Sequence, residues 1–216
     1  MKTQGIKTID ATGNDNDGKI NGGKWVTGKF KSALEFNGKG SCGYSRFKRF
    51  RFGAGTNSFC LGQISGVESR CLEELGAKRG GRRCRDHRSK EVAKNVWAGG
   101  NWQNCQAVGG PNLEVGVWYF MVGAKLPDVG LEAYLDGEKI ATGNKKGDVD
   151  LTANLLYIGT GGPGSLPSSG VIDEVKMFNR ALKPNQIKRL MKEANVVQAK
   201  RKPTCYWGQL KVENMR

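Results

Sequence analysis

Apolar and polar residues alternate over most of the second half of the chain, and this two-residue period predicts β-strands. Between Val115 and Val122, apolar residues fill both alternating sets, as expected of a strand buried on both faces inside a sandwich. Apolar runs at 131–135 and 138–141 are joined by Asp136-Gly137, a pair typical of two-residue hairpin turns because both positions require positive φ. Two more strands are expected, at 155–159 and 171–178.

The first forty residues show the same pattern in a weaker form. Residues 10–18 are rich in Gly, Asn and Asp, which favour tight polar loops because they tolerate positive φ and bond to their own backbone. Leu34 and Phe36 then alternate with polar neighbours, as in a half-buried strand.

A short helix is expected near the end of this otherwise all-β domain. Pro184 is suited to the first turn of a helix, and Ile187, Leu190 and Met191 have the spacing of one apolar face. The residues beyond 196 are basic, and only Tyr206, Trp207 and Leu210 indicate packing there.

The middle of the chain, residues 42–105, shows neither the strand period nor the helix period, so we expect an irregular region. Residues 42–94 hold 13 of the 35 Lys and Arg, 9 of the 13 Arg, 4 of the 6 Cys and the only His, against 5 of the 20 Asp and Glu. Elsewhere the basic residue is mostly lysine. Two different compositions therefore share one chain of 216 residues, long enough for one all-β domain with a sizeable core.

The formal net charge of +15 raises the question of nucleic-acid binding, because clustered Lys and Arg neutralise phosphates. The densest run is Arg79–Arg88, and it lacks the interleaved aromatic residues of a base-stacking platform. A solvated charge run is the favoured interpretation, and no nucleic-acid partner is expected.

The cysteines and the single histidine could also be read as a zinc site. Cys84 and His87 are three residues apart, but Cys60 and Cys71 do not form the second close pair that a structural zinc site needs. The irregular spacing of the six cysteines favours free thiols over structural disulfides.

No apolar run approaches the roughly 20 residues that span a bilayer, so no transmembrane segment is expected. The first residues carry lysines without an apolar stretch behind them, which predicts no signal peptide. The protein would then stay inside the cell, unless its true N-terminus lies upstream of Met1.

Several of these segments together resemble one family. The loop at 10–18 and the runs at 28–30 and 33–38 are similar to the opening of LamG-like jelly-roll domains of the concanavalin A-like lectin/glucanase superfamily. The Tyr134–Gly137 hairpin, the Tyr157–Gly159 strand end and the run at 172–182 resemble the closing half of these domains in the right order.

This resemblance implies an all-β fold of two antiparallel sheets packed face to face, in a secreted or cell-surface protein. It predicts a single domain over residues 8–193, interrupted by the Arg/Cys-rich segment at about 42–105, and a basic tail at 194–216. Because family-like sequence flanks that segment on both sides, we expect the segment to come from a shifted reading frame or a gene-model error. Peptides that cover residues 42–105 would disprove this.

The family resemblance implies a non-catalytic module that binds a glycan or an extracellular protein. Laminarinase-like hydrolysis is the alternative, and it requires two carboxylates that flank the glycosidic bond. Glu132 and Asp136 are four residues apart, but the hairpin turn removes Asp136 from the sheet, and the adjacent Asp173 and Glu174 point to opposite faces. No catalytic residue is therefore expected.

Two kinds of binding residue are predicted. The loop oxygens of Asp10, Asn14, Asn16 and Asp17 could ligate Ca²⁺, with Asp173 nearby by family resemblance, although the same residues also form ordinary polar turns. Exposed aromatic rings can stack on sugar rings, and the candidates are Trp97, Trp102 and Tyr134.

Overall fold

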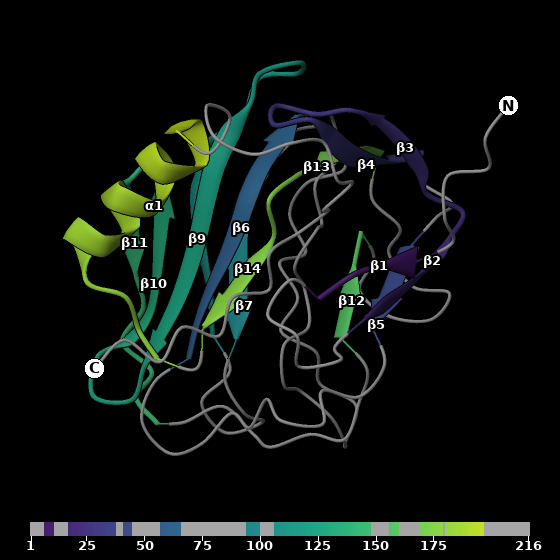
Figure 1. Cartoon of the computed structure of the whole chain (residues 1–216). Helices are drawn as coiled ribbons and strands as arrows, with labels where there is room; N and C mark the ends of the chain where they lie inside the picture. Colours follow the sequence, from purple (N-terminus) through teal and green to yellow (C-terminus); the bar gives the residue numbers. More distant parts are fainter. Residues whose placement is uncertain are drawn as a thin grey trace, which may run out of the picture.

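The computed structural model describes residues 7–10, 17–37, 41–44, 57–65, 94–99, 106–147, 156–159, 169–178 and 180–196. Within these residues almost all regular structure is antiparallel sheet (Figure 1).

The larger sheet forms one side of a sandwich, with the strand order β11-β10-β9-β6-β13-β4-β3, and β14 pairs with β6. Its strands are β3 (Lys24–Thr27), β4 (Ser32–Asn37), β6 (Asn57–Ser65), β9 (Tyr119–Leu126), β10 (Gly130–Leu135), β11 (Glu138–Thr142), β13 (Ser169–Ile172) and β14 (Lys176–Phe178).

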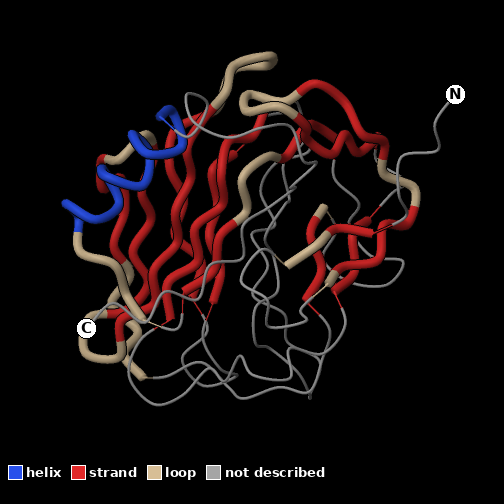
Figure 2. The backbone as a smooth tube through the Cα atoms, viewed as in Figure 1, coloured by secondary structure: helices blue, strands red, loops and turns tan. Residues whose placement is uncertain are grey.

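A smaller sheet with the order β1-β2-β5-β12 lies opposite part of the larger one (Figure 2). Its strands are β1 (Lys7–Thr8), β2 (Gly18–Asn21), β5 (Ser41–Tyr44) and β12 (Leu156–Ile158). A two-stranded ladder of β7 (Lys94–Gly99) and β8 (Gln106–Asn112) contacts β10, so it covers another part of the larger sheet. The described residues thus confirm the predicted two-sheet antiparallel β-sandwich.

The two faces of the larger sheet contribute to two separate apolar clusters. The inner cluster lies between the sheets and includes Leu34, Phe36, Met121, Ile158 and Ile172. The outer cluster lies under helix α1 (Pro184–Val196), the single described helix, and includes Phe120, Val122, Tyr134, Phe178 and Ile187. Alternate residues of β9 thus enter opposite clusters, which confirms that this strand is buried on both faces.

The helix begins at Pro184 as predicted, and it packs on the sheet through Ile187, which is fully buried. Its N-terminus is closed by Gln186, whose side-chain oxygen accepts a hydrogen bond from the backbone N–H of Lys183 (3.0 Å). No helix in the described part of the chain is long and apolar enough to cross a membrane.

The hairpin turn predicted at Asp136-Gly137 is confirmed, because Asp136 has φ 49° and Gly137 has φ 85°. Asp136 also fixes the neighbouring strand: its carboxylate accepts a hydrogen bond from the backbone N–H of Phe120 (2.8 Å), and its own N–H donates to the carbonyl of Phe120 (2.8 Å).

Two predicted strands are shorter than expected. The strand expected from Val115 begins only at Tyr119, because a turn at Val115 and Gly116 (φ 80°) precedes it and leaves Val115 64% exposed. The strand expected over 171–178 is divided into β13 and β14, because Glu174 has φ 52° and interrupts the extended backbone.

The segment at 42–105, expected to be irregular, contributes most of β5 and all of β6 and β7. β6 lies between β9 and β13 in the middle of the larger sheet, and its pairing with β9 shifts register between Leu61 and Ile64. A central strand needs no polar face, and a bulge breaks the two-residue period of apolar and polar residues. For these two reasons the alternation in the sequence did not predict β6.

Candidate functional site

The most deeply buried acidic side chain of the described residues, Asp173, connects two parts of the larger sheet that are distant in sequence. It is 1% exposed, and its Oδ2 accepts a hydrogen bond from the backbone N–H of Phe30 (2.8 Å), in the loop between β3 and β4. Its Oδ1 accepts from the N–H of Glu174 (2.8 Å). Asp173 thus holds the β3–β4 loop against the break between β13 and β14.

The β3–β4 loop is shaped to admit this carboxylate. The N–H of Gly28 donates to the carbonyl of Lys31 (3.1 Å), and Lys31 has φ 64°, so the turn is tight. A Cβ atom at Gly28 would lie 2.4 Å from Oδ2 of Asp173, too close for any other residue to fit without movement.

Burial raises the pKa of Asp173 to about 7, because it disfavours the charged form more than the hydrogen bonds from Phe30, Glu174 and Lys29 favour it. The negative charge of Glu174 raises the pKa further. Lys176 pairs with Glu174 (3.3 Å) rather than with Asp173.

This pKa predicts a pH-dependent stability. Between about pH 4 and pH 7 the folded protein holds a proton on Asp173 that the unfolded chain releases, so the free energy of unfolding should fall as pH rises, by at most about 1.4 kcal/mol per pH unit. Urea unfolding of Asp173→Asn and of the parent protein at pH 4.5, 5.5 and 6.5 measures this contribution. The parent should show the steeper fall, and identical slopes would contradict the prediction.

A second polar cluster joins β10 to β11. The hydroxyl of Tyr134 donates to Glu132 Oε2 (2.7 Å), and the Lys139 ammonium pairs with Glu132 Oε1 (3.0 Å). Burial and the neighbouring carboxylate both raise the pKa of Tyr134 above its usual value, so the phenol keeps its proton at neutral pH.

The three aromatic residues predicted to bind ligand differ in their placement. Tyr134 is 1% exposed and belongs to the outer cluster beneath α1, which removes its ring from any surface that a sugar can reach. Trp97 lies in β7, where its backbone pairs with that of Val108. Trp102 lies outside the described residues.

The predicted calcium ligands are only partly brought together. Asp17 Oδ1 accepts a hydrogen bond from the backbone N–H of Asp10 (3.0 Å), so these two residues are neighbours, while Asn14 and Asn16 lie outside the described residues. Both oxygens of Asp173 face backbone N–H groups, which fits a structural role better than a place among metal ligands. In the part of the chain that the structure describes, no group of three or more acidic, His or Cys side chains could hold a metal ion.

The sequence pattern does not indicate that the β3–β4 loop contacts Asp173. The hydrogen bond between Phe30 and Asp173 joins residues 143 positions apart, and the only local signal was Gly28 within a Lys-rich turn. Similarly, nothing in the alternation marked Lys125 as buried, although it is 2% exposed and its ammonium donates to the carbonyl of Lys145.

The described residues form an antiparallel β-sandwich domain with one helix packed on its larger sheet. Residues 73–188, more than half of the chain, match the family described as the concanavalin A-like lectin/glucanases superfamily. The chain belongs to this superfamily. The matched range begins inside the Arg/Cys-rich segment and ends within α1.

Solved structures of other proteins share the fold at low sequence identity. Domain 4 of AbnA, a GH43 extracellular arabinanase from Geobacillus stearothermophilus in complex with arabinotriose, has a TM-score of 0.61 and 17% identity over 84% of this chain and 91% of that domain. The binding domain of Paraclostridial Mosquitocidal Protein 1 has a TM-score of 0.61 and 11% identity over 87% of this chain. The matched region covers about half (51%) of that binding domain. No curated protein matches the sequence.

Proposed function

We propose that this domain is a non-catalytic binding module whose ligand is a glycan or an extracellular protein, and that it works in a secreted or cell-surface protein. The observation that carries the proposal is the structural use of the carboxylates in the larger sheet. A retaining or inverting glycosidase needs two carboxyl groups about 5–10 Å apart that face the scissile bond.

The carboxylates that the sequence offers for that role make other contacts. The oxygens of Glu132 bind Tyr134 and Lys139, and Asp136 lies in the hairpin turn with an oxygen on the Phe120 N–H. Asp173 holds the β3–β4 loop. These contacts support binding over hydrolysis, and the arabinotriose complex of the similar arabinanase domain supports a glycan as the ligand class.

A glycan array that includes arabino-oligosaccharides tests this proposal, run with calcium and with a chelator, and followed by a reducing-end assay on each glycan that binds. We expect retention of at least one glycan class and no release of reducing ends. Release of product at a rate that scales with protein concentration would establish a glycosidase. Loss of binding in chelator would support the calcium site at Asp10 and Asp17.

A further inference from the structure

The positive charge of this chain is concentrated in two segments, and one of them contains a described helix. Residues 180–216 hold 10 of the 35 Lys and Arg and 2 of the 20 Asp and Glu. Apart from these residues and the segment at 42–94, the chain carries 12 basic and 13 acidic residues and is nearly neutral. The net charge is therefore a local property and not a general feature of the surface.

Helix α1 presents part of this charge to solvent. Residues 180–192 contain five basic and no acidic residues. Arg189 and Lys192 are exposed, and the Lys188 side chain is 45% exposed. Lys188, Arg189 and Lys192 are here called the α1 basic surface. Lys192 follows Lys188 by four positions and Arg189 by three, so it is a surface neighbour of both on the helix.

The α1 basic surface is held in place by the opposite face of the helix. Ile187 is fully buried in the outer cluster, with Leu190 and Met191 packed against it. The buried Gly137 lies beneath Lys188 and Met191, and the ammonium of Lys188 pairs with Glu138. A docked helix loses little further freedom when a ligand binds to it.

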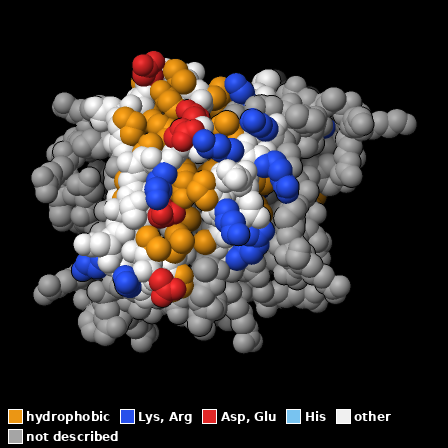
Figure 3. All heavy atoms as spheres, turned by 90° about the vertical axis from the view of Figure 1, so that its left-hand side faces the viewer, with side chains coloured by type: hydrophobic (Ala, Val, Ile, Leu, Met, Phe, Trp, Pro, Cys, Tyr) orange, Lys and Arg blue, Asp and Glu red, His pale blue; other side chains and the backbone are white. Residues whose placement is uncertain are grey.

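The chemistry of this surface selects a charged ligand. Basic side chains are spread over this side of the molecule, with acidic and apolar side chains among them (Figure 3). Among the residues of α1 whose burial the structure describes, the exposed ones are Pro184, Asn185, Arg189 and Lys192, and none of them carries an aromatic ring to stack on a neutral sugar. The exposed charges of Arg189 and Lys192 therefore favour a ligand that carries negative charges.

We infer that the exposed face of α1 binds an anionic glycan, one whose sugars carry sulfate or carboxylate groups. This inference rests on the proposed glycan-binding function and adds to it the charge of the ligand and the place of contact. Each anionic group that pairs with a basic side chain of α1 releases condensed counterions, so the affinity should fall steeply with salt.

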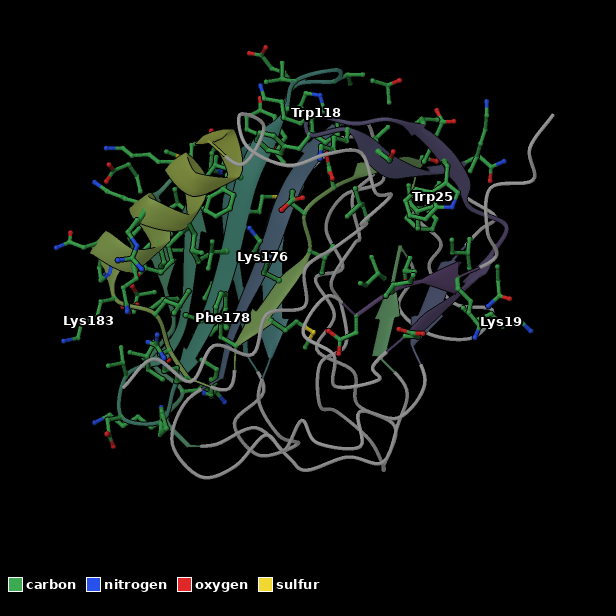
Figure 4. The ribbon with its side chains drawn as sticks, viewed as in Figure 1. Lys19, Trp25, Trp118, Lys176, Phe178 and Lys183 are labelled. Carbon is green, nitrogen blue, oxygen red and sulfur yellow. The ribbon has the colours of Figure 1, made fainter. Side chains whose placement is uncertain are left out.

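Dextran sulfate and neutral dextran form a matched pair of probes, because they share one backbone and differ in charge. The test variant is Arg189→Glu/Lys192→Glu. The control variant is Lys19→Glu/Lys24→Glu, which makes the same change of charge at two exposed residues of β2 and β3, and Figure 4 shows Lys19 on the side of the molecule opposite α1.

We expect the parent protein to bind dextran sulfate in 0.1 M salt and to bind dextran far more weakly. The α1 variant should lose at least about tenfold in affinity and show a shallower salt dependence, while the control should lose less than about threefold. Circular dichroism of both variants should match the parent, because the substituted side chains are exposed.

Equal losses in the two variants would overturn the inference, since total charge and not the α1 surface would then set the affinity. Equal binding of dextran and dextran sulfate would also overturn it, while leaving a glycan-binding module intact. Tighter binding to duplex DNA than to dextran sulfate at equal concentration of negative charge would overturn it in favour of a nucleic-acid ligand. Failure to bind any glycan on the array would instead count against the proposed function itself.

Discussion

Asp173→Ala is expected to lower the free energy of unfolding by about 3 kcal/mol at pH 5. At this pH the side chain is mostly protonated in the folded protein, and both of its oxygens still accept backbone hydrogen bonds, from Phe30 and Glu174. Alanine leaves these N–H groups without their acceptor, and a buried unsatisfied donor costs roughly 1–3 kcal/mol. Urea denaturation at fixed pH measures the loss.

Two controls separate the hydrogen bonds from the charge. Asp173→Asn keeps one acceptor oxygen and should lie between alanine and the parent, while Asp128→Ala changes an exposed turn carboxylate and should stay within about 0.5 kcal/mol. The loss of unfolding free energy caused by Asp173→Ala should be smaller at pH 8. At that pH the buried carboxyl group of the parent protein is charged, and this lowers the stability of the parent itself. An alanine variant as stable as the parent at pH 5 would show that Asp173 does not hold the β3–β4 loop.

The parts of this fold that sequence predicted well are those specified by residues close together in the chain. The turn at Asp136-Gly137 follows from two residues that tolerate positive φ, and helix α1 follows from Pro184 and an apolar face three to four residues apart. Leu34 and Phe36 are buried as their alternation predicted. Each of these signals is complete within about ten residues.

The parts that sequence did not predict depend on contacts between distant residues. Alternation places Glu132 and Tyr134 on one face of β10, but it does not show that α1 covers Tyr134 on that face. Nor can it show that β6 lies between β9 and β13, because a central strand has neighbours on both edges and no required polar face. The placement of Asp173 depends on a loop 143 residues earlier, so family resemblance alone assigned it to calcium.

The packing between the two sheets gives the second large prediction, at Gly159. This glycine follows β12 with φ 80°, and a Cβ atom added there would lie 3.0 Å from three ring carbons of Phe36, which is 2% exposed in the inner cluster. Gly159→Ala therefore combines a left-handed backbone with a collision in a packed core. We expect it to lower the free energy of unfolding by about 3 kcal/mol.

Gly116 provides a control with the same backbone angle and none of the crowding. It also has φ 80°, but a Cβ atom added there would have no other heavy atom within 4 Å. Gly116→Ala should therefore report the cost of the backbone conformation alone, about 1 kcal/mol. The difference between the two alanine variants then measures the contact with Phe36.

A double-mutant cycle tests whether that contact is the cause. Phe36→Leu removes the ring, so Gly159→Ala introduced into that background should cost little more than Gly116→Ala does, although Phe36→Leu itself lowers stability. If Gly159→Ala costs the same in both backgrounds, the close approach of β12 to β4 is not what requires glycine. Relief in the Phe36→Leu background would show that this contact sets how closely the smaller sheet packs on the larger one.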